Sequence, residues 1–205
     1  MPKKNEAVVV APERLEAASD HVDWIGHAMA DASFTATYRT RAAAACFAVV
    51  QEHHQAIVIL TDHRIFASSF ALVRVAFDSY VRGAWLSLCA TEAQAEAFFG
   101  GKEPEGMNVL LKALEGKPEF SNGDLTAIKA GSWKAMCAYT HTGGLQVQRW
   151  NTDDAVEPNY ALDEVMEVLL FSELLGMMSV VSFAGLIDDT ALANDALARL
   201  KAMGR

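Results

Sequence analysis

The sequence has few cysteines and lacks the short motifs of the common cofactor-dependent enzymes. Its three cysteines, Cys46, Cys89 and Cys137, lie far apart in apolar surroundings. This is typical of reduced core thiols and argues against a disulfide framework or a cysteine-based zinc cluster. No GxSxG, GxGxxG, P-loop or CxxC motif occurs in the 205 residues. We therefore expect no cofactor.

Positive charge is also scarce. The chain carries 17 Lys and Arg against 26 Asp and Glu, for a net charge of -9 and a pI near 5.1. This balance argues against a general electrostatic grip on DNA or on an anionic membrane. Between Arg39 and Arg82, however, five arginines stand against three acidic residues. This segment either receives an anion or faces acidic residues on neighbouring helices.

Strand-like alternation of apolar and polar residues is missing as well, and proline is limited to five residues. Apolar residues recur instead at helical spacing, so we predict an all-α fold. We expect one helical-bundle domain over residues 12–205, with four to five long helices and short connecting helices, after a disordered or extended tail at 1–11. The expected helices span about 12–29, 36–60, 65–90, 105–114, 124–139 and 160–186, with a terminal helix from about 188. Asp62 is a candidate cap for the helix over 65–90. The stretch TEAQ at 91–94 matches the capping-box pattern, so a short helix is expected to start there.

The helix over 65–90 is predicted to be central. Its main apolar stripe has helical spacing, and further apolar residues lie on the opposite side, which indicates burial on both sides. The main stripe consists of Phe66, Phe70, Val73, Phe77, Val81, Ala84 and Leu88, and the opposite side carries Leu72, Val75 and Leu86.

One apolar segment, Val168 to Ile187, is about as long as the roughly 20 residues that span a bilayer. Glu173 interrupts it and its flanks are acidic, so we interpret it as a buried core helix rather than a membrane span. The apolar run near the N-terminus is too short for a signal peptide. We therefore expect a cytoplasmic protein without a membrane partner.

Charged residues punctuate the central helix in the stretch RVAFDSYVR. Arg74, Asp78 and Arg82 follow one another at four-residue steps and share one face. Asp78 can compensate one arginine, and Glu173 is the candidate partner of the other, in a closed structural network. In the alternative, the remaining guanidinium faces a pocket and binds a phosphate or a carboxylate. All three residues are candidate binding residues.

A second polar stretch, AYTHTGGLQVQRW, contains the candidate catalytic residues. His141 at a helix end could act as an acid or base, and Arg149 could stabilise an anionic intermediate. Tyr139 and Thr142 are candidate binding residues that orient the histidine. The alternative is a simple helix end, with His141 favoured by the helix dipole and Gly143 as a left-handed cap.

Metal binding has less support. Asp23, His27 and Asp31 recur at four-residue steps, and Glu52 precedes His53 and His54 without forming an HExxH motif. Because the sequence identifies no convergent third ligand, we expect no metal site.

Together, LVRVAFDSYVRGAWLSLCA and AYTHTGGLQVQRW resemble a family of uncharacterised bacterial all-helical proteins, over about Ile65 to Leu186. The arrangement also loosely resembles HEPN-like (higher eukaryotes and prokaryotes nucleotide-binding) bundles. That resemblance implies an RNA-cleaving protein, often a homodimer and often part of a phage-defence or toxin system. The polar Arg, Asp and His residues by themselves predict a pocket for a phosphate-bearing small molecule or RNA.

The chain departs from the HEPN ribonuclease signature, which places an arginine four to six residues before the histidine. Here Lys134 precedes His141, and Arg149 follows it. The alternative hypothesis is a non-catalytic binding or oligomerisation module, in which the Arg, Asp and Glu residues form a purely structural network.

Overall fold

The computed structural model describes residues 8–30 and 32–203, and all regular secondary structure within them is helical. This confirms the predicted all-α fold. The tail predicted at 1–11 falls largely outside the described residues, and Val8 to Ala11 are not helical. The helices are α1 (Pro12–Met29), α2 (Tyr38–Asp62), α3 (Phe66–Leu88), α4 (Glu92–Phe99), α5 (Met107–Glu115), the 3-10 helix η1 (Pro118–Phe120), α6 (Asp124–Thr140), α7 (Gly144–Gln148), α8 (Leu162–Leu186) and α9 (Thr190–Met203).

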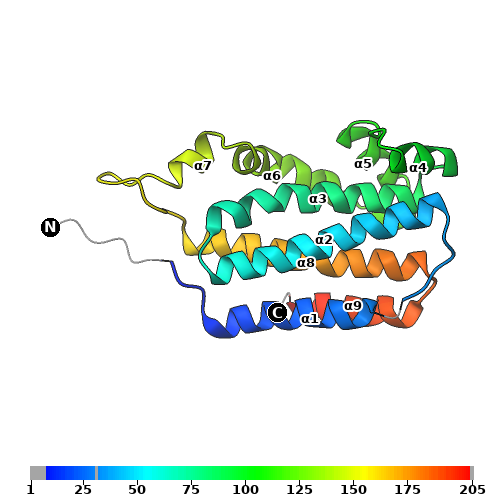
Figure 1. Ribbon diagram of the computed structural model, residues 1–205, viewed down its shortest axis with the longest axis horizontal. Coiled ribbons are helices and arrows are strands. Elements are labelled where there is room, and N and C mark those ends of the chain that lie inside the picture. The colour runs from blue at the N-terminus through cyan, green and yellow to red at the C-terminus, as the bar shows by residue number, and fades with distance from the viewer. Residues whose placement is uncertain (1–7, 31, 204–205) are drawn as a thin grey trace.

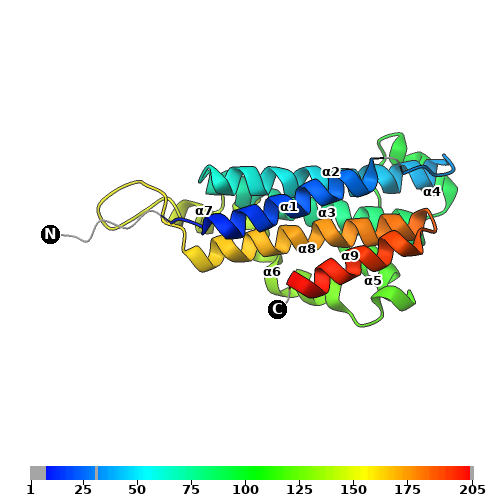
Figure 2. The same cartoon turned by 90° about the horizontal axis from the view of Figure 1, so that it is seen from below.

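Long helices running side by side form the body of the molecule (Figure 1). Helix α2 packs on both α3 and α8, and α3 also contacts α8. On one side of this group α1 lies along α2 and α8, while α9 lies along α8 (Figure 2). On the other side α5 and α6 pack on α3, and α4 packs on α2. Helices α4, α5 and α6 therefore cover the face of the bundle opposite α1 and α9.

The central position predicted for the helix over 65–90 is confirmed. On α3 the stripe from Phe66 to Ala84 is buried, and Leu86 is buried on the opposite side, while Leu72 and Val75 are half-buried. The contacts of α3 with α2, α5, α6 and α8 explain why both of its sides are apolar.

The structure corrects two details of the predicted helices and confirms a third. Asp62 was expected to cap the third helix, but it ends α2, and Ile65 occupies the cap position of α3 without a side-chain hydrogen bond. The short helix α7 was not predicted, because it has only five residues. The capping box at Thr91 is confirmed, since its hydroxyl accepts from the Gln94 backbone while the Gln94 side chain accepts from the Thr91 backbone.

A glycine allows the closest approach of α2 and α3. A Cβ atom added to Gly83 would lie 2.7 Å from the ring of Phe47 and 3.0 Å from the Cβ of Cys46. Because Phe47 is fully buried, it cannot move away freely. Gly83→Ala is expected to lower the free energy of unfolding by about 1–3 kcal/mol, the usual cost of overpacking a core.

Chemical denaturation measures this effect, and Gly185→Ala on α8 is the matched control. A Cβ at Gly185 would meet no atom within 4 Å, so alanine there is expected to stabilise the protein by up to about 1 kcal/mol. Equal effects of the two substitutions would contradict the close approach at Gly83.

Within residues 8–30 and 32–203, two helices, Tyr38–Asp62 and Leu162–Leu186, are long and apolar enough to cross a membrane. The sequence prediction identified only the second. Core helices of soluble proteins have the same length and composition, and more than half of the apolar window in α8 is buried inside the molecule (56%). The burial of α8 accords with its interpretation as a core helix.

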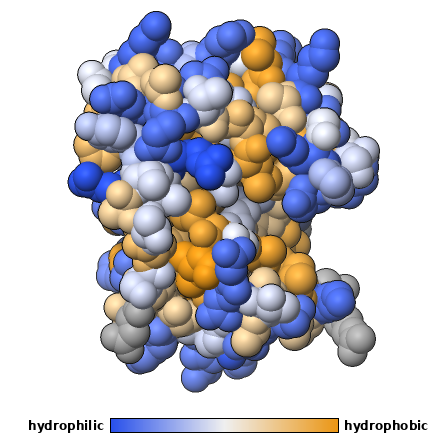
Figure 3. All heavy atoms as spheres, turned by 90° about the vertical axis from the view of Figure 1, so that its right-hand side faces the viewer, coloured by the Kyte–Doolittle hydropathy of each residue, from blue (hydrophilic) through white to orange (hydrophobic). Residues whose placement is uncertain are grey.

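At the end of the bundle near α4 and α5, apolar side chains are exposed between charged ones (Figure 3). Tyr38 at the start of α2 and Phe99 at the end of α4 are 42% and 50% exposed, and their rings are 5.8 Å apart. The Arg41 guanidinium lies 5.0 Å from the Phe99 ring centroid. We call these three residues the end patch.

Candidate functional site

The structure joins the two polar stretches of the sequence at one point. Arg74, on α3, and His141, directly after α6, meet through a hydrogen bond between a terminal guanidinium nitrogen and His141 Nε2. Helix α6 is held on α3 nearby, because the Thr140 hydroxyl donates to the backbone carbonyl of Ala71 at 3.1 Å. The elbow after α6 therefore contributes directly to the cluster on the central helix.

The elbow brings His141 into place with a conformation that differs from the prediction. In the simple helix-end alternative Gly143 is a left-handed cap, but its φ is -73°, and Thr142 adopts the left-handed conformation with φ of 52°. Gly143 is needed for close packing instead, since a Cβ there would lie 3.0 Å from the Ala138 Cα. Thr142 is exposed, and its place in the turn gives it a structural part in positioning its neighbour His141.

Arg74 has two further neighbours. Its guanidinium carbon lies 4.9 Å from the ring centroid of Trp133 on α6, and its Nε lies 3.7 Å from Asp78 Oδ2. The Lys129 ammonium is also 4.9 Å from the Trp133 centroid. Burial raises the pKa of Asp78, while the cations Arg74 and Arg82 act in the opposite direction. We call Arg74, Asp78, Trp133 and His141 the α3–α6 cluster.

The hydrogen bond with Arg74 fixes the form of His141. A guanidinium group has N–H donors and no acceptor, so the Nε2 that it contacts must carry a lone pair. His141 is then neutral, with its proton on Nδ1. The cluster therefore has two kinds of N–H donor: the guanidinium of Arg74 and, on the other edge of the imidazole from Nε2, the Nδ1–H of exposed His141.

Arg82 does not join this cluster. It pairs with Glu103 at 3.0 Å, in the loop after α4, and the two side chains are 34% and 71% exposed. The expected pairing of the remaining arginine with Glu173 is wrong, because Glu173 is bound to Arg14 and His21. An ion pair this exposed contributes about 1 kcal/mol or less, because solvent screens it.

Glu173 lies instead at the interface of α8 and α1. Its carboxylate receives two hydrogen bonds from the Arg14 guanidinium and one from His21 Nδ1 at 2.8 Å. Only 1% of Glu173 is exposed. The sequence could not reveal this pairing, because α1 and α8 are separated by more than 130 residues and the spacing within a helix does not show which distant helix packs against it.

Arg149 likewise binds a carboxylate. Its guanidinium donates two hydrogen bonds to Glu164 in the first turn of α8. The bonds to Glu164 raise the pKa of Arg149 above its ordinary value. Tyr139 packs edge-on against Phe70, with ring centroids 4.9 Å apart. The predicted catalytic residues His141 and Arg149 therefore lie in different places. His141 belongs to the α3–α6 cluster, whereas Arg149 is bound to Glu164.

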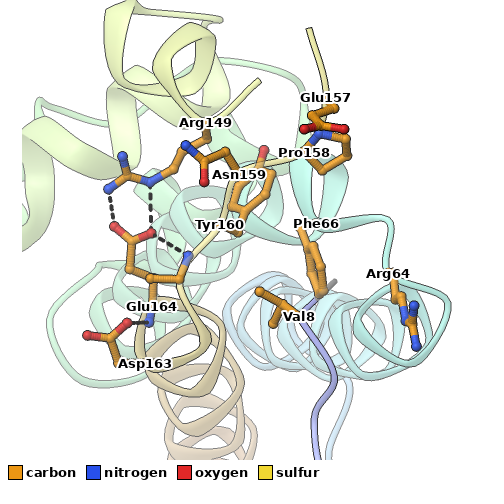
Figure 4. Close-up of a pocket in the computed structure, with 11 residues that line it drawn as sticks. Val8, Arg64, Phe66, Arg149, Glu157, Pro158, Asn159, Tyr160, Asp163 and Glu164 are labelled. Carbon is orange, nitrogen blue, oxygen red and sulfur yellow. Dashed lines mark hydrogen bonds and ion pairs between the residues drawn. The ribbon is translucent and has the colours of Figure 1, made fainter. Parts of the chain in front are cut away.

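The Arg149–Glu164 pair lies in the wall of a pocket of about 670 Å³ (Figure 4). Glu164 also accepts from the Ala161 backbone N–H, which ties this wall to the start of α8. Since two guanidinium nitrogens are already bound to Glu164, Arg149 has less capacity to bind an anion than Arg74. The pocket is lined by Val8, Arg64, Phe66, Arg149, Glu157, Pro158, Asn159, Tyr160, Ala161, Asp163 and Glu164.

No group of three or more His, Cys, Asp or Glu side chains within residues 8–30 and 32–203 is arranged to hold a metal ion. His27 Nδ1 contacts the Asp23 backbone carbonyl at 2.7 Å, and Asp31 lies outside the described residues. Of the two neighbouring histidines, His54 is buried and contacts the Ser172 hydroxyl at 3.1 Å.

Sequence reasoning missed Trp133 in the α3–α6 cluster. The available signal was its position two helical turns before His141, on the helix that delivers this histidine. A comparable arrangement occurs on α9, where Arg199 lies 3.8 Å from Asp195 and 4.4 Å from the ring of Trp24. There the Asp195 side chain is 56% exposed, and none of the described histidines contacts Arg199 in a hydrogen bond. The added histidine therefore distinguishes the α3–α6 cluster.

Comparison with curated proteins and with solved structures finds no match in either. The sequence model of a family of unknown function, DUF6988, matches residues 47–202. The matched segment contains the whole α3–α6 cluster and excludes α1. Because it covers most of the chain, the expected kinship with an uncharacterised family is confirmed, and the protein belongs to the DUF6988 family of unknown function.

Proposed function

We propose that the α3–α6 cluster binds a phosphate group of single-stranded RNA. The observation that carries this proposal is the hydrogen bond between Arg74 and His141. Through this bond an arginine from α3 lies next to His141. On α6 itself, the basic residue that precedes His141 is Lys134 and not an arginine. Arginine and a histidine N–H are both suited to phosphate oxygens.

Trp133 supports a nucleic-acid ligand over inorganic phosphate. Its half-buried ring lies next to two cations, Arg74 and Lys129, in a chain that is acidic overall. Aromatic rings beside basic side chains bind single strands by stacking with bases while the cations hold the backbone. Net acidity disfavours long-range attraction to duplex DNA, so the proposed ligand is a short single-stranded segment.

In the catalytic form of the proposal, His141 takes or gives a proton during cleavage of the strand, and Arg74 holds the phosphate. The loose HEPN-like resemblance supports this form and suggests a cytoplasmic homodimer with a phage-defence or toxin role. Asp78 would balance the charge of Arg74, while Arg149 and Tyr139 would hold the elbow through Glu164.

The test is binding of a 5′-labelled single-stranded RNA, measured by fluorescence anisotropy, followed by a cleavage assay on a gel. Arg74→Ala and His141→Ala are each expected to weaken binding about 10- to 100-fold, since a hydrogen bond to a charged group contributes about 1.5–3 kcal/mol. The matched control is Arg199→Ala, which removes an arginine from the same kind of Asp and Trp surroundings.

Equal affinity of wild type and Arg74→Ala would reject the proposed site. Cleavage that is equal in wild type and His141→Ala, or absent in both, would reject the catalytic form and leave binding alone.

A second candidate function, a non-catalytic oligomerisation module, is favoured by the end patch. Aromatic residues and arginine are enriched at the energetic centres of protein interfaces, and Tyr38, Phe99 and Arg41 are such residues on an exposed surface. The ion pairs of Arg14, Arg82 and Arg149 also suit a structural network. Sedimentation analysis of wild type and Phe99→Ser tests it: a dimer that Phe99→Ser dissociates is expected, and a wild-type monomer would reject it.

A further inference from the structure

Two buried polar atoms of the α3–α6 cluster lack a hydrogen bond among the described residues. They are Nε of Arg74 and Oδ1 of Asp78. Buried polar groups in folded proteins nearly always have a partner, so an adjacent pair without one indicates that another arrangement satisfies them. These two residues are one helical turn apart on α3, within reach of each other.

The present position of Arg74 explains why both atoms are left over. Its terminal nitrogen is engaged with His141 Nε2, and its Nε stays 3.7 Å from Asp78 Oδ2. This separation is about half an ångström or more beyond a normal N–H···O hydrogen bond. A small rotation of the guanidinium toward Asp78 would place Nε–H and a neighbouring terminal N–H on the two carboxylate oxygens, the paired geometry that arginine and carboxylate favour. The same rotation would draw the guanidinium away from His141.

The position of Arg74 determines whether Nε2 of His141 can accept a proton from another molecule. While the guanidinium donates to Nε2, the lone pair of that nitrogen is occupied and cannot accept a proton from another molecule. Once Arg74 turns away, Nε2 becomes free and His141 gains the acceptor that a general base needs. The two positions of one arginine thus correspond to a blocked and an available histidine.

From these contacts we infer that an oxyanion bound to the α3–α6 cluster moves Arg74 from His141 to Asp78 and so frees His141 Nε2. The anion and Asp78 together offer the guanidinium more acceptor oxygens than the imidazole does, which favours the second position. The inference rests on the proposed function, because the phosphate of the bound strand is the anion that triggers the movement.

The arginine on α9 shows what is specific to this cluster. Arg199 also lacks a hydrogen bond at its Nε and also lies near an aspartate, Asp195. Asp195 is largely exposed, so water can satisfy its carboxylate. Asp78 Oδ1 is buried and can be satisfied by turning Arg74. Of these two arginines, Arg74 alone has two competing positions.

The experiment follows the His141 imidazole nitrogens by NMR in the full-length ¹⁵N-labelled protein, with inorganic phosphate as the probe. Without phosphate, Nδ1 is expected to be protonated and Nε2 to show the signature of a hydrogen-bonded acceptor. With phosphate, the Nε2 resonance is expected to shift, and the Nε–H proton of Arg74 is expected to move downfield as it bonds to Asp78. The Nε–H resonance of Arg199 serves as an internal control and should stay unchanged.

Two variants separate the switch from the anion site. Arg74→Gln is expected to give the phosphate-treated His141 spectrum before any phosphate is added. Asp78→Asn is expected to retain phosphate-dependent shifts at Trp133 while the change at His141 Nε2 is largely lost, because the second position of Arg74 is weakened.

The outcomes distinguish the movement of Arg74 from the phosphate site itself. Phosphate-dependent shifts at Arg74 and Trp133 with an unchanged His141 Nε2 overturn the switch and leave the proposed phosphate site standing. Identical ligand-free His141 spectra in wild type and Arg74→Gln overturn the switch without reference to any ligand. If phosphate changes none of these resonances, the phosphate site and the switch both fail.

Discussion

Arg14→Met is expected to lower the free energy of unfolding by about 3–5 kcal/mol, as measured by urea denaturation at neutral pH. This is the usual cost of removing one partner from a buried ion pair. Glu173 is only 1% exposed, and Arg14 supplies two of its hydrogen bonds. Burial alone would raise the pKa of Glu173, but hydrogen bonds from His21 and Arg14 bring it below its ordinary value. Without Arg14, the carboxylate keeps only His21 as a charge partner.

A double variant distinguishes loss of the ion pair from loss of packing. Arg14→Met combined with Glu173→Leu removes both charges, and it should recover most of the stability lost in Arg14→Met alone. Arg199→Met is the control for losing an arginine on an exposed helix face, with an expected change within about 1 kcal/mol. A single variant as stable as this control would show that Glu173 is not held by Arg14.

The second large effect concerns pH and His54. Burial lowers the pKa of His54 from 6.5 to about 4, while the nearby Glu173 acts in the opposite direction. As pH falls below 6.5, the unfolded chain binds a proton that the folded protein does not, so stability decreases until about pH 4. A shift of this size corresponds to roughly 3 kcal/mol. Denaturation midpoints recorded between pH 7 and pH 4 measure this loss.

His54→Asn is expected to remove that loss, since asparagine keeps a donor for the Ser172 hydroxyl and does not titrate. It should be less stable than wild type at pH 7, because the ring packs on Gly176 and leaves a cavity when shortened. Glu173 contributes separately: its lowered pKa means that its contribution is lost below its ordinary pKa, at the acid end of the range. His63→Asn is the control, as the His63 side chain is 65% exposed. Parallel pH profiles for wild type and His54→Asn would contradict the neutral, buried state of His54.

Most of the fold could be predicted from periodicity. The stripe on α3 alone indicated a central helix, because a helix that is apolar on two sides needs neighbours on both. The predicted start of a helix was less accurate where no capping side chain marks it. Ile65 precedes α3 without a side-chain hydrogen bond, so the sequence favoured Asp62 as the cap. The five-residue α7 contains too little periodic pattern to detect.

The candidate site was predictable only in part, for a reason that lies in helix packing. Spacing along α3 places Arg74, Asp78 and Arg82 on one face, but it does not say which helix covers that face at each level. Arg82 meets the loop that contains Glu103, while Arg74 meets the end of α6. The partner of Glu173 depends on where α1 docks, and the weak apolar stripe of α1, which buries only Ala18 and Ile25, does not determine that position.

The residues that the family model matches and the residues that fold together are different sets. The match begins at Phe47, inside α2, so its boundary leaves out the first nine residues of that helix and all of α1. A fragment trimmed to this boundary would expose one side of α2 and α8 and would leave Glu173 without Arg14 and His21. Transplanting or expressing this domain therefore requires α1 as well, since the first helix supplies the counter-charge for the interior of the last long one.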